Sequence, residues 1–243
     1  MPHRPPLIEM RLGDNPVYRL ELARHRRQRG AVIAPLAAVL INAVCLSLVM
    51  YRAREGFQTV VLLGSALVAA AGPIAVAAGT ARAVASEYSG QRLAALALTS
   101  VPAYDILRGK FHAVARAAFV TMAAVWLLDL FAIGVAFVTG APVEPGLPAA
   151  VVSLAFVGLA GCYLSGAVAA LAATLTRSPG PAMGLSLAAA GLSALLWAWP
   201  LFGAPETQVL LPVACVAAAL FLAGVPVAFS LALTLLERSL SHR

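Results

Sequence analysis

Long apolar runs constrain this chain more than any other feature of its sequence. A helix needs about 20 apolar residues to cross the hydrocarbon core of a bilayer. Six runs meet that requirement: residues 31–50, 58–80, a stretch from after 110 to about 138, 149–175, 181–199 and 209–236. Hydrophobic residues make up 61% of the 243 residues and charged residues 11%, against about 45–50% and 25% in soluble domains. The sequence therefore predicts an all-α integral membrane protein with six transmembrane helices in a single domain, residues 1–243.

The basic residues predict how this domain lies in the lipid bilayer. Six spans place both termini on the same side as the connections around residues 81–116 and Arg177, and that side holds 15 of the 17 basic residues. Only Arg52 and Arg54 fall on the other side. Because basic residues in short loops favour the cytoplasmic side, we expect a multi-pass protein of the cytoplasmic (inner) membrane with both termini in the cytoplasm. The cations border apolar runs instead of lining a soluble face, which argues against nucleic acid as a partner despite the net charge of +7.

Residues 1–30 are expected to form a cytoplasmic tail and an interface helix. In Gly13-Asp14-Asn15-Pro16, either Asp14 or Asn15 can cap a helix whose first residue is Pro16. The basic, amphipathic stretch 17–29 that follows is typical of a helix lying in the membrane interface. A simple basic anchor that sets the topology explains the same pattern equally well.

A polar segment, residues 86–110, separates the second apolar run from the third. Gly90 and Pro102 bracket a short predicted helix, and Gly109 permits close backbone approach where the third span begins. Lys110 is placed to extend its ammonium group toward lipid phosphates. A short rigid helix joined to two spans can transmit motion from a soluble partner to the membrane.

The pattern of this segment resembles the cytoplasmic connection of type-2 ATP-binding-cassette exporter permeases. The matching features are Glu87, Gly90, the apolar run 93–98, Thr99-Ser100, Asp105-Ile106 and Gly109-Lys110. The N-terminal Asn15-Pro16-Val17, with Arg19 and Glu21, also resembles the interface helix that opens this family. Two positions depart from the family pattern: Gln91 stands for a threonine, and Ser100 stands for a proline, with Pro102 two residues later.

The resemblance implies a permease subunit that works with a separate cytoplasmic ATPase, which holds ATP and Mg²⁺, and with a second permease subunit as a homo- or heterodimer. The 86–110 segment would be the coupling helix. Its expected ATPase contact comprises Glu87, Gly90, Arg92, Leu93, Leu96 and Leu98. Asp105, Gly109 and Lys110 would close the segment. The alternative is a membrane scaffold that recruits a soluble partner without transporting; a secondary transporter is a weaker third option, because no inverted repeat is evident.

Residues that could carry catalysis are scarce. Gly109-Lys110 is followed by Phe111 and lacks the upstream glycine of a phosphate-binding loop, and no His or Cys cluster has metal-ligand spacing. We therefore expect neither enzymatic activity nor a bound metal or cofactor in this chain. Asp129 is the one carboxylate inside an apolar run, and such a residue is by default a functional hypothesis. It either lies on a substrate path, together with Asn42, or forms a packing hydrogen bond to a group such as Asn42.

Overall fold

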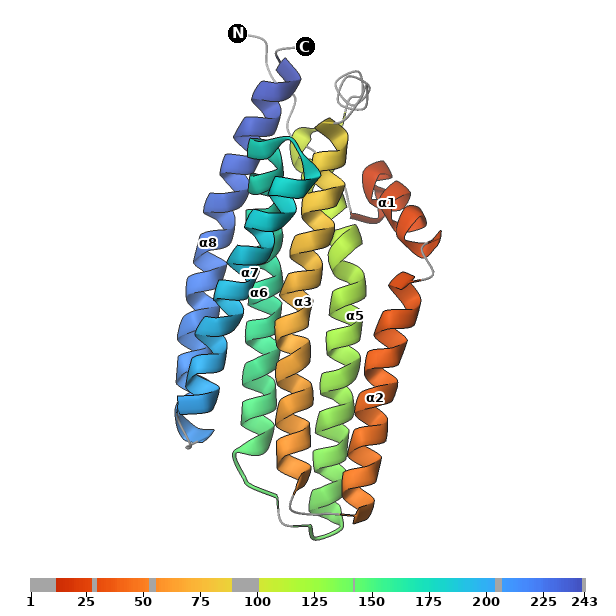
Figure 1. The fold of residues 1–243 in the computed structure, drawn as a ribbon, viewed down its shortest axis with the longest axis vertical. Coiled ribbons are helices and arrows are strands. Elements are labelled where there is room, and N and C mark those ends of the chain that lie inside the picture. Colours follow the sequence, from red (N-terminus) through yellow and green to blue (C-terminus); the bar gives the residue numbers. More distant parts are fainter. Residues whose placement is uncertain are drawn as a thin grey trace.

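The computed structural model describes residues 12–27, 30–52, 56–88, 101–141, 143–203 and 207–241. Apart from short turns, these residues are helical. The helices are η1 (Leu12–Asp14), α1 (Pro16–Arg27), α2 (Gly30–Arg52), α3 (Phe57–Tyr88), α5 (Ala103–Val138), α6 (Leu147–Thr176), α7 (Pro179–Gly203) and α8 (Thr207–Ser241). Figure 1 shows the long helices side by side in an upright bundle, with α1 on its outside near one end.

Four stretches of the described residues are helical, long and apolar enough to cross a membrane. They are Phe57–Tyr88, Ala103–Val138, Leu147–Thr176 and Ala218–Leu240. Large apolar side chains on them face outward; Leu127 is 67% exposed and Phe131 is 69% exposed. Outward-facing apolar surface on this scale suits lipid better than water. The structure thus confirms an α-helical membrane protein, while the count of six spans, which also needs α2 and α7, stays a prediction.

Two helices extend beyond their predicted spans toward the 86–110 segment. α3 continues past Thr80 to Tyr88, and α5 begins at Ala103, with Pro102 as its N-cap residue in an extended conformation. The apolar runs are shorter than the helices because an apolar run indicates only which residues are soluble in lipid, whereas a helix continues through polar residues that have adequate helix propensity. Asp105, Gly109 and Lys110 therefore lie on the first turns of α5. Of the predicted coupling helix, the structure describes only its two flanks.

Helices α3 and α6 pack closely against each other within the bundle. A Cβ atom at Gly158 would lie 3.1 Å from the Ala69 Cα atom, and one at Gly161 would lie 3.0 Å from the Pro73 Cγ atom. Small residues let transmembrane helices approach closely. The small residues of α6 therefore serve packing within this chain at these positions.

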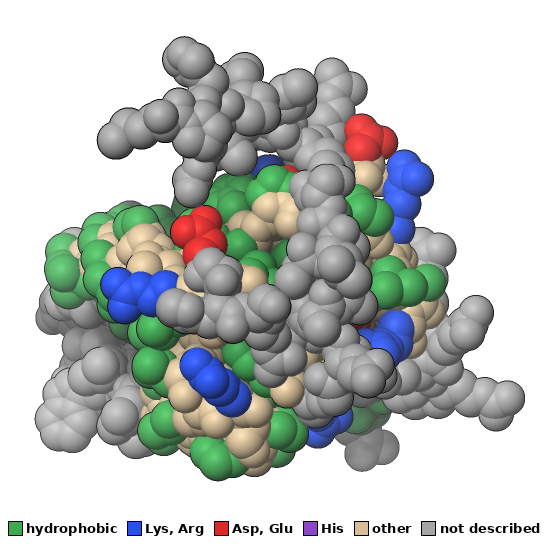
Figure 2. Space-filling model, turned by 90° about the horizontal axis from the view of Figure 1, so that it is seen from above, with side chains coloured by type: hydrophobic (Ala, Val, Ile, Leu, Met, Phe, Trp, Pro, Cys, Tyr) green, Lys and Arg blue, Asp and Glu red, His purple; other side chains and the backbone are tan. Residues whose placement is uncertain are grey.

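The ends of the helices alternate between the two ends of the bundle. α1, the end of α3, the start of α5, the α6–α7 turn and the end of α8 share one end, at the top of Figure 1, which we name the α1 end. Figure 2 views this end and shows Lys and Arg side chains distributed over it. The arrangement groups the segments that the sequence predicts to be on one side of the membrane; the compartment that this side faces stays a prediction.

Candidate functional site

Asn15 fixes the start of α1 against α5. Its Oδ1 atom accepts hydrogen bonds from the backbone N–H groups of Val17, at 2.9 Å, and Tyr18, at 3.2 Å. These bonds satisfy two N–H groups that a helix start leaves unpaired. The Asn15 Nδ2 atom donates to the backbone carbonyl of Asp105 at 2.7 Å. Of the two predicted capping residues, Asn15 is thus the cap, and it also joins two helices 90 positions apart in the sequence.

Gly109 provides the space that α1 occupies. A Cβ atom at this position would lie 3.0 Å from the Tyr18 backbone nitrogen and 3.1 Å from the Asn15 amide. Backbone atoms cannot move aside as a flexible side chain can, so a side chain here would push α1 away from α5. The predicted close approach at Gly109 is therefore confirmed, and the approaching backbone belongs to α1.

Lys110 lies between two carboxylates at the same place. Its Nζ atom is 2.8 Å from Oε1 of Glu21, on α1, and 2.7 Å from Oε1 of Glu87, near the end of α3. The side chains are almost removed from solvent, with exposed fractions of 2% for Lys110, 4% for Glu21 and 14% for Glu87. We name Glu21, Glu87 and Lys110 the charged junction. It joins three helices through one ammonium group.

The geometry of the charged junction determines what it can do chemically. A lysine ammonium has three N–H donors, and two of them are directed at carboxylates here. Lys110 is therefore engaged inside the protein instead of extending to lipid phosphates. Removing one member of a buried ion pair leaves an uncompensated charge. The junction consequently holds α1, α3 and α5 in one relative position, on both flanks of the 86–110 segment.

The residues that the sequence singled out in the 86–110 segment divide into two groups. The structure brings Glu87 and Lys110 together, and it places Asp105 and Gly109 against α1. Outside the described residues lie Gly90, Arg92, Leu93, Leu96 and Leu98. The contact of Glu87 and of these five residues with an ATPase stays a prediction, as does the role of Asp105, Gly109 and Lys110 in closing the coupling segment. The carboxylate of Glu87 already has a partner within the chain.

Sequence reasoning missed Glu21 as a member of the site. It is the only acidic residue of α1, Pro16–Arg27, which carries four arginines. A lone carboxylate in a basic helix is a signal that could have led to a buried cation elsewhere. Leu20, the residue before Glu21 on α1, is 70% exposed.

Asp129 belongs to a second polar cluster, inside the bundle. Its Oδ1 atom accepts from the Asn42 amide of α2 at 2.9 Å, and its Oδ2 atom accepts from the Ser65 hydroxyl of α3 at 2.5 Å. Asp129 is fully buried. A Cβ atom at Gly64 would lie 2.5 Å from the Asn42 Oδ1 atom, so the glycine makes room for the amide. We name Asn42, Ser65 and Asp129 the bundle-centre cluster; the predicted Asn42–Asp129 contact is confirmed.

The bundle-centre cluster binds helices within one chain. All three residues are buried, and both carboxylate oxygens of Asp129 have a donor. These hydrogen bonds pack α2 and α3 against α5. The role of Asp129 and Asn42 on a substrate path stays a prediction. Within the described part of the chain, no group of three or more His, Cys, Asp and Glu side chains is arranged to hold a metal ion.

Comparison of the chain with family models, with curated proteins and with solved structures found no significant match.

Proposed function

We propose that this chain is the membrane-spanning permease subunit of an ATP-driven exporter of the type-2 ATP-binding-cassette class. In this proposal the chain crosses the cytoplasmic membrane six times, with both termini and the α1 end in the cytoplasm. A separate ATPase subunit binds ATP and Mg²⁺ and contacts the 86–110 segment. A second permease subunit completes the transport path, and this chain itself hydrolyses nothing.

The charged junction is the observation that carries this proposal. A permease without a phosphate-binding loop must receive force through a protein contact at the membrane surface. The Lys110 ammonium group ties the last turn of α3 to the start of α5 and to α1. A partner that pushes on the segment between α3 and α5 would therefore move both helices and α1 together. Such rigid attachment suits force transmission, whereas simple recruitment of a partner needs only a flexible tether.

Coupled ATP hydrolysis is the measurement that tests the proposal. The tagged chain is purified from its native membranes in mild detergent, returned to lipid, and assayed for bound ATPase protein and for ATP hydrolysis. Leu93→Asp and Leu96→Asp place a charge at the predicted apolar centre of the contact, and buried apolar anchors carry most of the energy of such contacts. We expect both variants to lose the ATPase and its activity. Leu93→Met is the conservative match, and Arg243→Ala is the remote control; both should retain activity.

The outcomes separate the exporter from the scaffold. Co-purification of a partner that depends on Leu93 but does not hydrolyse ATP would support a membrane scaffold. An ATPase that stays bound and active in both Leu→Asp variants would rule out the 86–110 segment as the coupling element. Either result would overturn the proposal as stated.

Membrane sidedness can be tested independently with two exposed carboxylates. Glu144 follows the end of α5, and Glu237 lies in the last turns of α8, so they belong to opposite ends of the bundle. In a background without Cys45, Cys162 and Cys215, we expect Glu144→Cys to react with an impermeant thiol reagent added outside intact cells. Glu237→Cys should react only after the membrane is opened. The reverse pattern would place the α1 end outside.

A further inference from the structure

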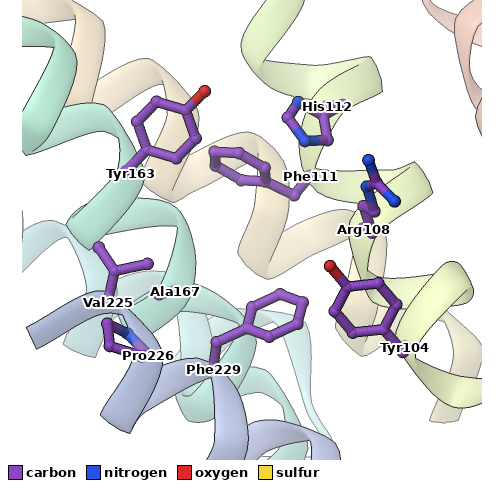
Figure 3. Close-up of a pocket in the computed structure, with 9 residues that line it drawn as sticks. All are labelled: Tyr104, Arg108, Phe111, His112, Tyr163, Ala167, Val225, Pro226 and Phe229. Atoms are coloured by element: carbon purple, nitrogen blue, oxygen red, sulfur yellow. The ribbon is translucent and has the colours of Figure 1, made fainter. Parts of the chain in front are cut away.

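A cavity of about 240 Å³ lies between α5, α6 and α8, apart from both polar clusters. Figure 3 shows its lining: α5 supplies Tyr104, Arg108 and His112, α6 supplies Tyr163, and α8 supplies Phe229 among the labelled side chains. Pockets for complete drug-sized ligands measure roughly 300–1,000 Å³. The cavity is therefore suited to part of a ligand whose remainder lies outside it.

One wall of the cavity is cationic and hydrogen-bonding. Tyr104, Arg108 and His112 follow one another at intervals of four residues, so they lie along one side of α5. The Arg108 Cζ atom is 5.8 Å from the centre of the Tyr104 ring. Of the residues that the structure describes, no carboxylate forms an ion pair with Arg108, and none lines the cavity.

The other walls are apolar and held by aromatic contacts. The Tyr104 and Phe229 rings meet edge to face with their centres 5.8 Å apart, and Tyr163 packs on Phe111 with ring centres at 5.4 Å. Ala167 of α6 keeps the interior open because it carries only a methyl group. Next to the cavity on α8, Val227 is 60% exposed. In a membrane this surface is covered by acyl chains, so the cavity borders lipid.

We propose that this cavity binds an anionic phospholipid of the leaflet at the α1 end, with the phosphate at Arg108 and His112 and part of one acyl chain between Tyr163, Ala167 and Phe229. Basic pockets between transmembrane helices recognise anionic head groups by this chemistry. The charge of the wall selects an anion, and the apolar interior selects an amphiphile over a free anion. The proposal requires a membrane-embedded bundle but not the exporter function.

The test uses phosphatidylglycerol with a photoreactive diazirine in its acyl chain. The purified full-length chain is reconstituted in phosphatidylcholine vesicles that contain a small fraction of this lipid, irradiated, and digested for mass spectrometry. We expect labelled peptides that contain Tyr163 and Ala167 or Phe229. Unlabelled phosphatidylglycerol should compete, whereas added phosphatidylcholine and inorganic phosphate should not. Neither ATP nor an ATPase is present, so failure here leaves the exporter proposal untouched.

Paired variants separate the two halves of the site. Arg108→Gln should lower labelling about fivefold, the effect expected of one basic side chain near anionic lipid. Arg82→Gln removes an exposed cation of α3 at the same end of the bundle and should change nothing. Ala167→Leu fills the apolar interior and should also lower labelling. Val168→Leu also enlarges an apolar side chain, by one carbon, at the neighbouring position outside the cavity lining, and should not lower labelling.

Three results would overturn the proposal. Equal competition by phosphatidylcholine would show that the head-group charge is not recognised. Equal competition by inorganic phosphate would show a free-anion site. Labelling that persists in both Arg108→Gln and Ala167→Leu, each eluting as a folded protein in size-exclusion chromatography, would place the lipid elsewhere.

Discussion

The charged junction and the bundle-centre cluster both connect helices through buried polar side chains, but they do so with different chemistry. Each joins three helices, each includes α3 and α5, and each centres on one α5 residue, Lys110 or Asp129. These two residues are separated by about 28 Å along α5, at 1.5 Å per residue. At the α1 end the partners of the central residue are charged. In the middle of the bundle they are an amide and a hydroxyl.

The difference follows from the distance to water. Burial of a full charge is costly in the hydrocarbon region, so the bundle-centre cluster uses one carboxyl group and two neutral donors. At the ends of the helices, the Lys110 ammonium group and the Arg24 guanidinium group, 3.4 Å from Glu21, balance the two carboxylates and remain close to the aqueous surface. The junction also holds α1, which lies outside the bundle, whereas the bundle-centre cluster holds only bundle helices. We therefore expect the junction to depend on charge and the cluster to depend on hydrogen bonding.

Replacing the central cation should produce the largest effect. Lys110→Met removes the cation that Glu21 and Glu87 share, while the ion pair of Glu21 with the half-exposed Arg24, at 3.4 Å, remains. Breaking a buried pair costs about 3–5 kcal/mol of the free energy of unfolding. The measurement is the midpoint of unfolding when dodecyl sulfate is titrated into mixed micelles. Adding Glu21→Gln and Glu87→Gln to Lys110→Met should recover most of the loss. A loss below about 1 kcal/mol in the single variant, the range of solvent-exposed pairs, would mean that the carboxylates reach water and that the junction is not a buried ion pair.

Removing the central carboxyl group of the bundle should cost less. Asp129→Leu breaks two interhelical hydrogen bonds, each worth about 0.6–1.7 kcal/mol in membrane proteins, so we expect a loss of about 1–3 kcal/mol. Asp129→Asn keeps a polar group of the same shape, so it should lower the free energy of unfolding less than Asp129→Leu does. The same unfolding titration measures both variants. Normal stability of Asp129→Asn combined with loss of ATP-coupled activity would instead favour a role for Asp129 on the substrate path.

Removing a single carboxylate of the junction should produce a smaller and more local effect. Glu21→Gln leaves Lys110 paired with Glu87, so we expect a loss of about 1 kcal/mol, the scale of one hydrogen bond. Because Glu21 is the member on α1, trypsin should cleave after Arg24 faster in this variant. Ser65→Ala, in the bundle-centre cluster, is the matched control and should leave that cleavage rate unchanged. Equal acceleration in both variants would show that α1 follows global stability and not the junction.

An exposed ion pair between η1 and the start of α1 provides the smallest expected effect. The Asp14 Oδ1 atom and the Arg19 Nη2 atom are 3.3 Å apart, but the two side chains are 64% and 68% exposed. Solvent screening reduces such pairs to about 0–1 kcal/mol. Asp14→Ala should therefore leave the unfolding midpoint almost unchanged. A loss comparable to that of Glu21→Gln would show that burial does not explain the strength of the junction.

The sequence predicted the helical membrane architecture because hydrophobicity is a local property that each run carries by itself. It predicted the Asn42–Asp129 contact for a related reason: polar side chains are so few inside the apolar runs that the choice of partners is small. The Ser65 contact was missed because a serine bonds readily to its own helix and gives no sign of a distant partner.

The charged junction was harder to predict. Glu21 and Lys110 are 89 positions apart, and charged residues are common near membrane surfaces. Around Lys110 nothing local distinguishes an internal pair from a solvated charge; the one local sign was on α1, where Glu21 is the lone carboxylate among four arginines. Lys110 was expected to face lipid phosphates for this reason. Its burial results from the docking of α1 onto Gly109, which depends on the tertiary arrangement.

The lengths of α3 and α5 have a mechanical consequence. With 32 and 36 residues, these helices measure about 48 Å and 54 Å at 1.5 Å per residue, whereas the hydrocarbon core is about 30 Å thick. Relative to the predicted spans, each projects eight residues, or about 12 Å, at the α1 end. The Lys110–Glu87 ion pair connects these two projecting helix ends. A sideways force on the connected ends would tilt α3 and α5 together, whereas without the ion pair each helix would bend alone.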